Sequence, residues 1–284
     1  MLIRALAVAA LLGSSSITAS ALSPVQAQTE LAPISVAELM QATALDEVFT
    51  QFGAAIEASP QEQGVPFDAM LMGVWVEAAR EVFDAKTMHG ALATALEGEF
   101  SPEEETVLAT FFRSDFGHRI TDLERAVQTL GPQSQFAARL KGLSLVEAIA
   151  EGSRRDLQFD EIMTLVSADI ASAMVGQSVR GMLIGMSLTQ QRGDIEVPWE
   201  EIDLHLAQIL PSIEEDVSST QRAMLAYAYR DLPEADLDTY LEFLRTPAAQ
   251  KFYALASYSI GQIVTDTMTT FGERLASKMG RVNV

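Results

Sequence analysis

The sequence contains no cysteine among its 284 residues. Disulfides, thiolate metal sites and acylation of an N-terminal cysteine are therefore excluded. Histidine is nearly as scarce, with three residues in the whole chain. The sequence has no His-Glu-x-x-His motif, and a metal site needs three or four converging ligands. We therefore expect neither a metal ion nor another cofactor.

Two acid–histidine pairs nevertheless have helical spacing. Glu201 and His205 are four residues apart, as are His118 and Asp122. Each pair would place two polar groups on one face of a helix. Because neither pair has a third candidate ligand nearby in the sequence, we interpret both as ordinary surface pairs.

Basic residues are few. The chain has 19 Lys and Arg against 39 Asp and Glu, which gives a net charge of −20. Such a charge repels phosphate backbones and anionic bilayer surfaces, so we expect no nucleic-acid partner. Apolar residues make up 48% of the chain, which is enough for a sizeable core.

The chain also lacks long apolar runs, although a short apolar run lies near its start. Arg4 precedes an apolar stretch at 5–13, and a small-x-small pattern ends at Ala27. The stretch is too short to span a bilayer, but it is typical of a secretory signal peptide covering residues 1–27. We expect cleavage after Ala27, no transmembrane segment in the mature chain, and a periplasmic or secreted protein. Cleavage removes Arg4 and no acidic residue, so the mature net charge becomes −21.

No segment alternates polar and apolar residues with β-branched enrichment, and helix-start signals are frequent. Capping boxes are predicted at Ser35, Ser101, Ser144 and Ser212, each with Glu three residues later. The fold class is therefore all-α, with about ten to eleven helices. We expect helices at 36–58, 67–83, 87–98, 102–113, 115–130, 145–151, 160–190, 199–210, 213–230, 234–245 and 247–278. Pro211 is expected to break or kink the chain.

The chain also repeats itself. Residues 65–68 (Val-Pro-Phe-Asp) return at 197–200 as Val-Pro-Trp-Glu, and 111–114 (Phe-Phe-Arg-Ser) return at 243–246 as Phe-Leu-Arg-Thr, both at an offset of 132. With a gap, 38–40 (Glu-Leu-Met) match 161–163 (Glu-Ile-Met) at an offset of 123. We therefore predict two tandem, structurally similar multi-helix units. Copy one spans 34–143, a connector with the short helix spans 144–156, and copy two spans 157–284. The sequence leaves open whether the copies form one globule or two lobes.

The most specific repeated pattern is a predicted helix–corner–helix. A Phe buries the end of the first helix, a hydroxyl caps the second, and a small residue, Gly or Ala, allows close approach in its first turn. The residues are Phe111, Arg113, Ser114 and Gly117 in copy one, and Phe243, Arg245, Thr246, Pro247 and Ala249 in copy two.

This corner, with the acid-rich helix before it, resembles the bacterial exported-protein family numbered 2059 in the domain-of-unknown-function series. The better match is in copy two, at about 212–280, where Ala249 replaces the family's Gly. The resemblance covers about 50 residues of each copy. It implies an α-helical periplasmic domain and carries no catalytic residues.

Catalytic patterns are weak. Ser178 lies in Gly-Gln-Ser-Val-Arg-Gly, which lacks the Gly-x-Ser-x-Gly spacing of a nucleophile elbow and follows no strand. Acidic runs at 103–105 and 214–216 could supply general acid–base chemistry if one carboxyl were buried. Both runs are placed at predicted helix starts, where acids are favoured by the helix dipole, so we interpret them as solvated.

One stretch has an unusual composition, from 170 to 188. It combines methionines and glycines, and its candidate residues are Met174, Gly181, Met182, Gly185 and Met186. A core helix whose glycines allow close crossing is the simpler interpretation. The alternative is a methionine-lined groove for an apolar ligand or a partner helix, because methionine adapts to varied shapes.

The sequence leaves three functional hypotheses. The first is a non-enzymatic exported binding or interaction module, with an envelope protein or an apolar ligand as its unknown partner. The second is an envelope-acting hydrolase that uses a buried carboxylate or His205 as general base. The third is a carrier of a lipid or another apolar small molecule. A carboxyl with a strongly raised pKa in a shared cleft would favour the enzyme.

Overall fold

The computed structural model describes residues 32–45, 47–62, 69–166, 178, 181 and 199–282, and it is helical throughout these segments with no strand. The all-α prediction is confirmed for them. The first half contains α2 (Val36–Ala42), α3 (Val48–Glu62), α4 (Ala69–Val82), α5 (Ala85–Leu96), α6 (Pro102–Phe112), α7 (Asp115–Gln128) and α8 (Pro132–Ala148). The second half contains α9 (Arg154–Leu165), α11 (Trp199–Ala228), α12 (Glu234–Leu244) and α13 (Pro247–Val282).

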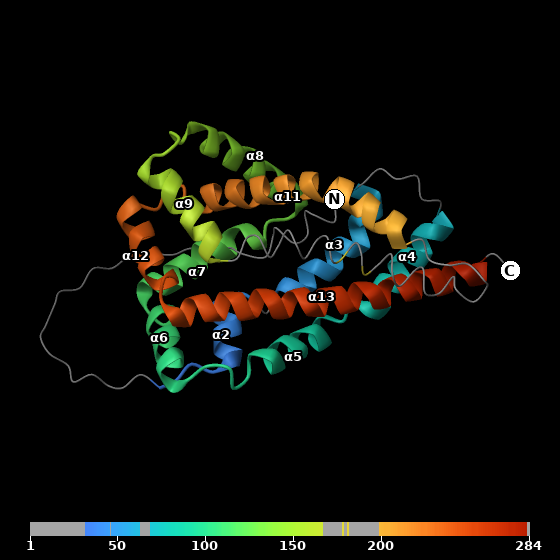
Figure 1. Cartoon of the computed structure of the whole chain (residues 1–284), viewed down its shortest axis with the longest axis horizontal. Helices are drawn as coiled ribbons and strands as arrows, with labels where there is room; N and C mark the ends of the chain where they lie inside the picture. Colours follow the sequence, from blue (N-terminus) through green and yellow to red (C-terminus); the bar gives the residue numbers. More distant parts are fainter. Residues whose placement is uncertain are drawn as a thin grey trace, which may run out of the picture.

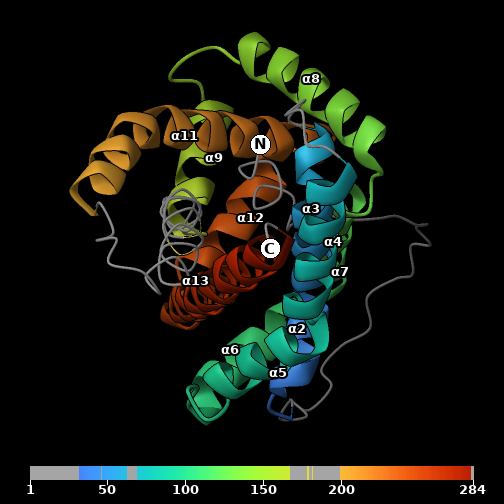
Figure 2. The ribbon, with the colours of Figure 1, turned by 90° about the vertical axis from the view of Figure 1, so that its right-hand side faces the viewer.

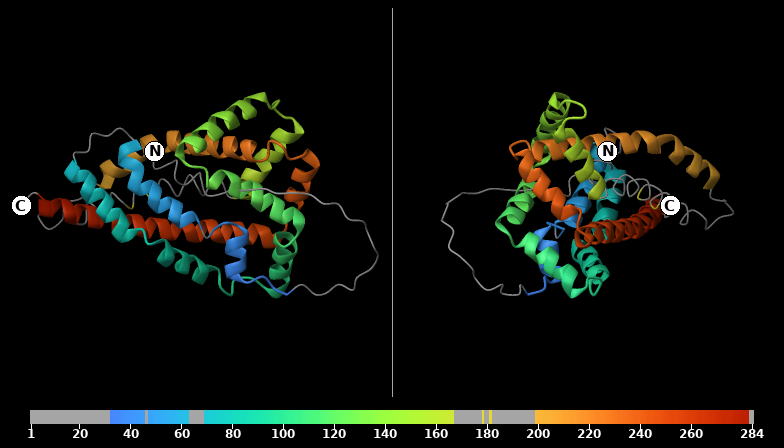
Figure 3. Two further views of the ribbon diagram at one scale, coloured as in Figure 1. Left: turned by 180° about the vertical axis from the view of Figure 1, so that it is seen from behind. Right: turned by 60° about the vertical axis from the view of Figure 1, so that its left-hand side comes forward.

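The two halves share one core. The long helix α13 runs along the longest axis of the molecule and packs against α4, α5 and α6 of the first half (Figure 1). Seen from behind, α4 and α5 lie along α13 (Figure 3). Trp75 of α4 meets Phe271 of α13 edge to face, with ring centroids 4.9 Å apart. One continuous apolar cluster contains residues of both halves, so the described residues form one globule rather than two lobes.

On the other side of the molecule, α8 packs along α11 (Figure 2). The close approach depends on Gly142, because a Cβ at this position would lie 1.9 Å from the Ala223 carbonyl oxygen. In turn, α11 contacts α7 and α9. Helices α7 and α8 of the first half therefore pack against the second half, and α13 of the second half packs against the first.

Several predicted helix starts are confirmed, and two are wrong. Ser35 caps α2, and Ser101 forms a complete capping box with Glu104 ahead of α6. Ser144 instead lies inside α8, where its hydroxyl donates to the Leu140 carbonyl. Ser212 lies inside α11. A serine and a glutamate three residues apart also occur in helix interiors, so the capping pattern alone was insufficient there.

Pro211 does not break the chain, because α11 continues through it. A proline in a helix removes one N–H and frees the carbonyl four residues earlier. Pro211 and Ala207 are both exposed, so water can hydrate that carbonyl. The helix is curved along its length (Figure 2), a response that proline commonly produces.

Three other helix boundaries differ from the prediction. The helix expected at 160–190 starts earlier, because Ser153 caps α9 ahead of Arg154, and α9 ends at Leu165. The single helix expected at 36–58 is divided into α2 and α3 by a turn in which Ala44 has a φ of 53°. The short helix expected at 145–151 is replaced by α8, which begins at Pro132 with Gly131 as its N-cap residue. Gly131 and Pro132 therefore separate α7 from α8 and also start the second of these helices. In the described segments, no helix has the length and apolar character required to cross a membrane.

Candidate functional site

The predicted helix–corner–helix is present at both positions. The Ser114 side chain accepts from the Gly117 N–H at 2.9 Å, and the Thr246 hydroxyl accepts from the Ala249 N–H at 3.2 Å. Both hydroxyls also donate backwards, Ser114 to the Phe111 carbonyl and Thr246 to the Phe243 carbonyl, each at 2.7 Å. A single side chain thus caps the second helix and binds the end of the first. Pro247 is the first residue of α13, as expected.

Gly117 is required by the tightness of the first corner. A Cβ on it would lie 1.9 Å from the Phe111 carbonyl oxygen and 2.8 Å from its carbonyl carbon. The corresponding residue in the second corner, Ala249, has a Cβ and is fully buried. The second corner is therefore wider than the first.

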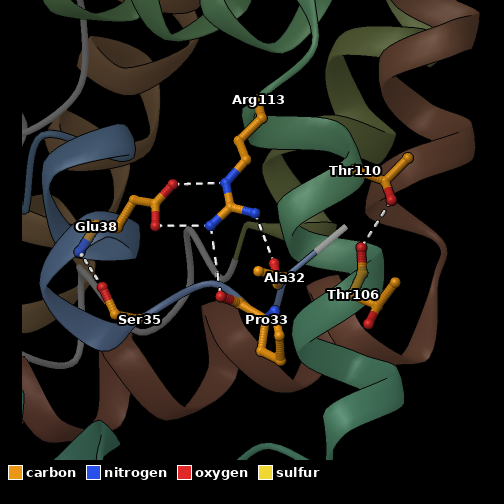
Figure 4. A network of polar contacts seen from close by, with 7 residues as sticks. All are labelled: Ala32, Pro33, Ser35, Glu38, Thr106, Thr110 and Arg113. Atoms are coloured by element: carbon orange, nitrogen blue, oxygen red, sulfur yellow. Dashed lines mark hydrogen bonds and ion pairs between the residues drawn. The ribbon is translucent and has the colours of Figure 1, made fainter. Parts of the chain in front are cut away.

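An arginine at each corner binds a glutamate from the helix that opens the same half. Arg113 donates from Nε and Nη2 to the two carboxylate oxygens of Glu38 at 2.6 and 2.7 Å. Its remaining Nη1 donates to the Ala32 carbonyl at 2.6 Å, and Nη2 also reaches the Pro33 carbonyl at 3.4 Å (Figure 4). The guanidinium thereby fixes residues 32–35 against the end of α6. It also holds the pKa of Glu38 below its usual value.

The second corner repeats this fork. Arg245 donates from Nε and Nη2 to Glu161 at 2.6 and 2.8 Å. The pKa of Glu161 is lowered by the same cause, its hydrogen bonds to the guanidinium. Glu38 and Glu161 are the residues that the sequence comparison aligned at an offset of 123.

Contacts between the halves also occur in reciprocal pairs. Arg119 of α7 binds Asp236 of α12 at 2.8 Å, while Lys251 of α13 binds Glu104 of α6 at 2.9 Å. Lys251 follows Arg119 by 132 residues, and Asp236 follows Glu104 by the same interval.

The two corner phenylalanines, also 132 residues apart, meet between these pairs. The Phe111 and Phe243 rings stack with centroids 3.6 Å apart and an interplanar angle of 2°. Each residue thus contacts its own counterpart. This is the pattern that an isologous interface produces at its two-fold axis.

Beside this stack lies a carboxylate surrounded by phenols, the Glu124 cluster, comprising Glu124, Tyr229, Tyr240 and Tyr253. Glu124 of α7 is half-buried as a residue, but its carboxyl group lies in the interior, where Oε1 accepts from the hydroxyls of Tyr229 and of Tyr240, the latter at 3.0 Å. The Tyr240 and Tyr253 hydroxyls are 3.3 Å apart. Tyr229 and Tyr240 are almost fully buried, at 0% and 1% exposure.

The electrostatics of the Glu124 cluster follow from its burial. Burial raises the pKa of Glu124, and the hydrogen bonds from Tyr229 and Tyr240 oppose that change only in part. Burial and the adjacent Glu124 charge raise the pKa values of all three phenols. A carboxyl that favours its neutral form is chemically suited either to general acid catalysis or to a pH-dependent structural contact.

The predicted methionine-lined groove falls mostly outside the described residues, which exclude Met174, Met182, Gly185 and Met186. Gly181 is described and buried, and a Cβ on it would lie 2.9 Å from both the Thr265 carbonyl oxygen and the Thr269 Oγ1 of α13. This supports the simpler interpretation, in which glycine allows a close crossing.

Other predicted candidates are dispersed. Ser178 is fully buried and has a polar partner. His118 is exposed, and the side chain of His205 lies outside what the structure describes. Glu104 belongs to a capping box and binds Lys251, which lowers its pKa. The run at 214–216 lies inside α11 rather than at a helix start, which corrects that part of the prediction. Within the described segments, no three His, Asp or Glu residues are grouped so that they could hold a metal ion.

Sequence reasoning missed the Glu124 cluster. Tyr229 and Tyr240 are buried, whereas Tyr258 is 63% exposed, so the tyrosines of this chain do not share one environment. Glu124 lies in an Asp-Leu-Glu-Arg segment that gives no sign of burial. Its phenol partners lie 105 and 116 residues away, so local pattern could not have found them.

Comparison with known proteins gives no match to a family model, to a curated protein or to a solved structure. The resemblance to the exported-protein family stays a prediction.

Proposed function

We propose that this chain is an exported, non-enzymatic binding or interaction module built from two divergent copies of one helical unit. The observation that carries the proposal is the reciprocity of the contacts between the halves. Arg119–Asp236 and Lys251–Glu104 exchange roles at one common offset. The described polar clusters mostly join one helix to another, which suits a scaffold better than a catalytic site.

The secondary structure supports the duplication further. Helices α6 and α12 have 11 residues each and start 132 residues apart, and α7 and α13 start at the same interval. The same offset of 132 aligns α8, which begins after Gln128, with the later part of α13. It also aligns α4 and α5 together with α11. Both long helices, α11 and α13, would thus lie in copy two, and copy one would divide each of them in two.

Export is the second part of the proposal. The predicted signal peptide at 1–27 and the resemblance to the exported family 2059 support a periplasmic or secreted location. A fusion of residues 1–35 to a reporter that is active only outside the cytoplasm tests this. Export of the fusion and N-terminal sequencing that starts at Gln28 are the expected results. A reporter that stays inside the cell would contradict the proposal.

The sequence offers residues 174–186, the predicted methionine-lined groove, as a candidate binding surface, although the close approach of Gly181 to α13 favours a core helix there. Native mass spectrometry of the mature protein, purified gently from the periplasm of its host, tests for a bound species. We expect co-purification of a protein partner that the substitution Met182→Lys abolishes. Met70→Lys is the matched control, because Met70 is 56% exposed on α4 and tolerates a charge. If the Met182→Lys and Met70→Lys variants retained the partner equally, the proposed binding groove would be wrong.

The same experiment separates the carrier alternative. A carrier would show an added mass on the order of a few hundred daltons, the size of an ordinary pocket ligand. Native mass spectra of the wild type would have to show this added mass, and spectra of the Met182→Lys variant would have to lack it.

A second candidate function, an envelope-acting hydrolase, is favoured by one observation. The raised pKa of Glu124 is what a general acid needs near neutral pH. In that case Glu124→Gln would abolish hydrolysis of envelope material while the fold remained intact. Both phenols would also have to yield their hydrogen bonds to a substrate, whereas in this structure they occupy Oε1 of the carboxylate.

A further inference from the structure

The Glu124 cluster joins both halves of the molecule through one carboxylate. Glu124 comes from α7, while Tyr240 comes from α12, Tyr253 from α13, and Tyr229 directly follows α11. Tyr240 also stacks near the Phe111–Phe243 pair, with its ring centroid 5.9 Å from that of Phe111. The carboxyl therefore lies beside the aromatic contact at which the halves meet.

The partners of Glu124 in the described residues are neutral phenols, and the nearby cations are engaged elsewhere. On α7 itself, Arg119 binds Asp236 of α12, and Arg125 donates to the Gln41 carbonyl of α2. From α9, Arg155 donates to the carbonyls of Tyr229 and Leu232.

Other cations on the surrounding helices also bind partners of their own. Lys251 of α13 binds Glu104 of α6, and Arg230, after α11, pairs with Asp231. Asp122 of α7 and Arg139 of α8 are half-buried, and the Nε atoms of Arg125 and Arg139 are buried without a hydrogen-bond partner. No ion pair in the described structure therefore compensates an ionised Glu124, and such a charge at a buried site is costly.

We propose that Glu124 is a pH-sensitive joint between the halves: the contact of α7 with Tyr229, which follows α11, and with Tyr240 of α12 is firm when the carboxyl is protonated and loosens when it ionises. The raised pKa of Glu124 agrees with this direction. A group with a raised pKa in the fold contributes its full stabilisation below its unfolded value. That contribution is lost as pH rises through the folded value. Mild acid should therefore tighten the molecule.

The Glu124 cluster occurs in one half only, although the contacts around it occur in both halves. This comparison of the halves is the one argument here that rests on the proposed duplication. At an offset of 132, the counterparts of Glu124, Tyr240 and Tyr253 are Ala256, Leu108 and Thr121. The buried acid is thus not needed to build the unit. Because only one of the two equivalent positions carries an acid, we infer that Glu124 serves a role of the whole protein rather than of the single unit.

The test compares wild type with Glu124→Gln, which keeps the shape of the side chain but cannot ionise. Urea unfolding is followed from about pH 5 to pH 8, the range in which a raised carboxyl titrates. At the acidic end we expect equal stabilities. Towards pH 8 the wild type should lose stability relative to the variant, with up to a tenfold change in unfolding constant per unit of pKa difference between the folded and unfolded states. Parallel profiles across the range would overturn the proposal.

Two further measurements keep the outcome interpretable. Glu103→Gln changes an exposed glutamate on α6 in the same way and should leave the pH profile of the wild type unchanged. If Glu124→Gln does not fold, the side-chain carboxyl carbon of Glu124 can be titrated by NMR in the wild type. A midpoint clearly above that of an exposed glutamate supports the joint, whereas an ordinary midpoint overturns it. Neither result depends on export or on the groove at 174–186.

Discussion

Replacing Gly117 by alanine tests how tightly the first corner is built. The added Cβ would lie 1.9 Å from the Phe111 carbonyl oxygen, an atom of the backbone that cannot rotate away. The end of α6 would have to move by about 1.5 Å to reach an ordinary carbon–oxygen contact. That carbonyl also accepts from the Ser114 hydroxyl and N–H, at 2.7 and 3.0 Å, and the Phe111 ring stacks on Phe243.

The magnitude follows from three contributions. Forcing a methyl group into a packed site costs about 1–3 kcal/mol, and weakening the Ser114 hydrogen bond costs about 1 kcal/mol. Removing a glycine from a helix returns about 1 kcal/mol. We therefore expect Gly117→Ala to lower the free energy of unfolding by about 2 kcal/mol. For a chain of this size the melting temperature should fall by about 4–8 °C.

Urea denaturation followed by circular dichroism measures this change, and Gly90→Ala is the matched control. Gly90 lies in α5 and is exposed, and a Cβ added to it would have no neighbouring atom within 4 Å. The same substitution there should stabilise the protein by about 0.5–1 kcal/mol. If Gly117→Ala were neutral, or as stabilising as Gly90→Ala, the close contact between α6 and α7 would be wrong.

Three other predictions concern the corners and their glutamates. Ser101→Ala removes a complete capping box and should cost about 1 kcal/mol in urea unfolding, and an unchanged midpoint would contradict the cap. The lowered pKa values of Glu38 and Glu161 stabilise the fold above the unfolded value of the carboxyl. That stabilisation should disappear as pH falls through the folded values, so an acid titration of the doubly Gln-substituted protein should be flatter than that of the wild type. A double-mutant cycle of Phe111→Leu and Phe243→Leu should give a coupling energy of about 0.5–1.5 kcal/mol, whereas additive effects would mean that the stack contributes nothing.

Local chemistry predicted the helices that begin with strong caps. Ser101 and Pro102 fix the start of α6, and the Leu-Pro-Glu segment at 232–234 precedes α12, which begins at Glu234 as expected. The turn at Ala44 was missed because an alanine with positive φ leaves no mark in the sequence. Tertiary packing decided the course of α8 and α11, whose close crossing at Gly142 joins segments far apart in the chain.

The candidate site was harder to predict than the fold. The equivalence of Arg113 and Arg245 was visible in the repeat, but their shared preference for a glutamate 75 and 84 residues earlier was not. Glu124 was overlooked for the same reason. Whether a carboxyl is solvated or surrounded by phenols depends on distant helices, which periodicity within one helix cannot reveal.

The packing of α13 on α4 has a consequence for how the chain folds. Lys278 near the end of α13 donates to Glu81 of α4 at 2.7 Å, across 197 residues of sequence. Contacts of such long range slow folding, because the chain entropy of closing the loop is lost before the contact forms. Until α13 has been synthesised, Trp75 lacks the Phe271 ring that it packs against. During synthesis the first half therefore exposes apolar surface to chaperones and proteases for longer than a self-contained domain would.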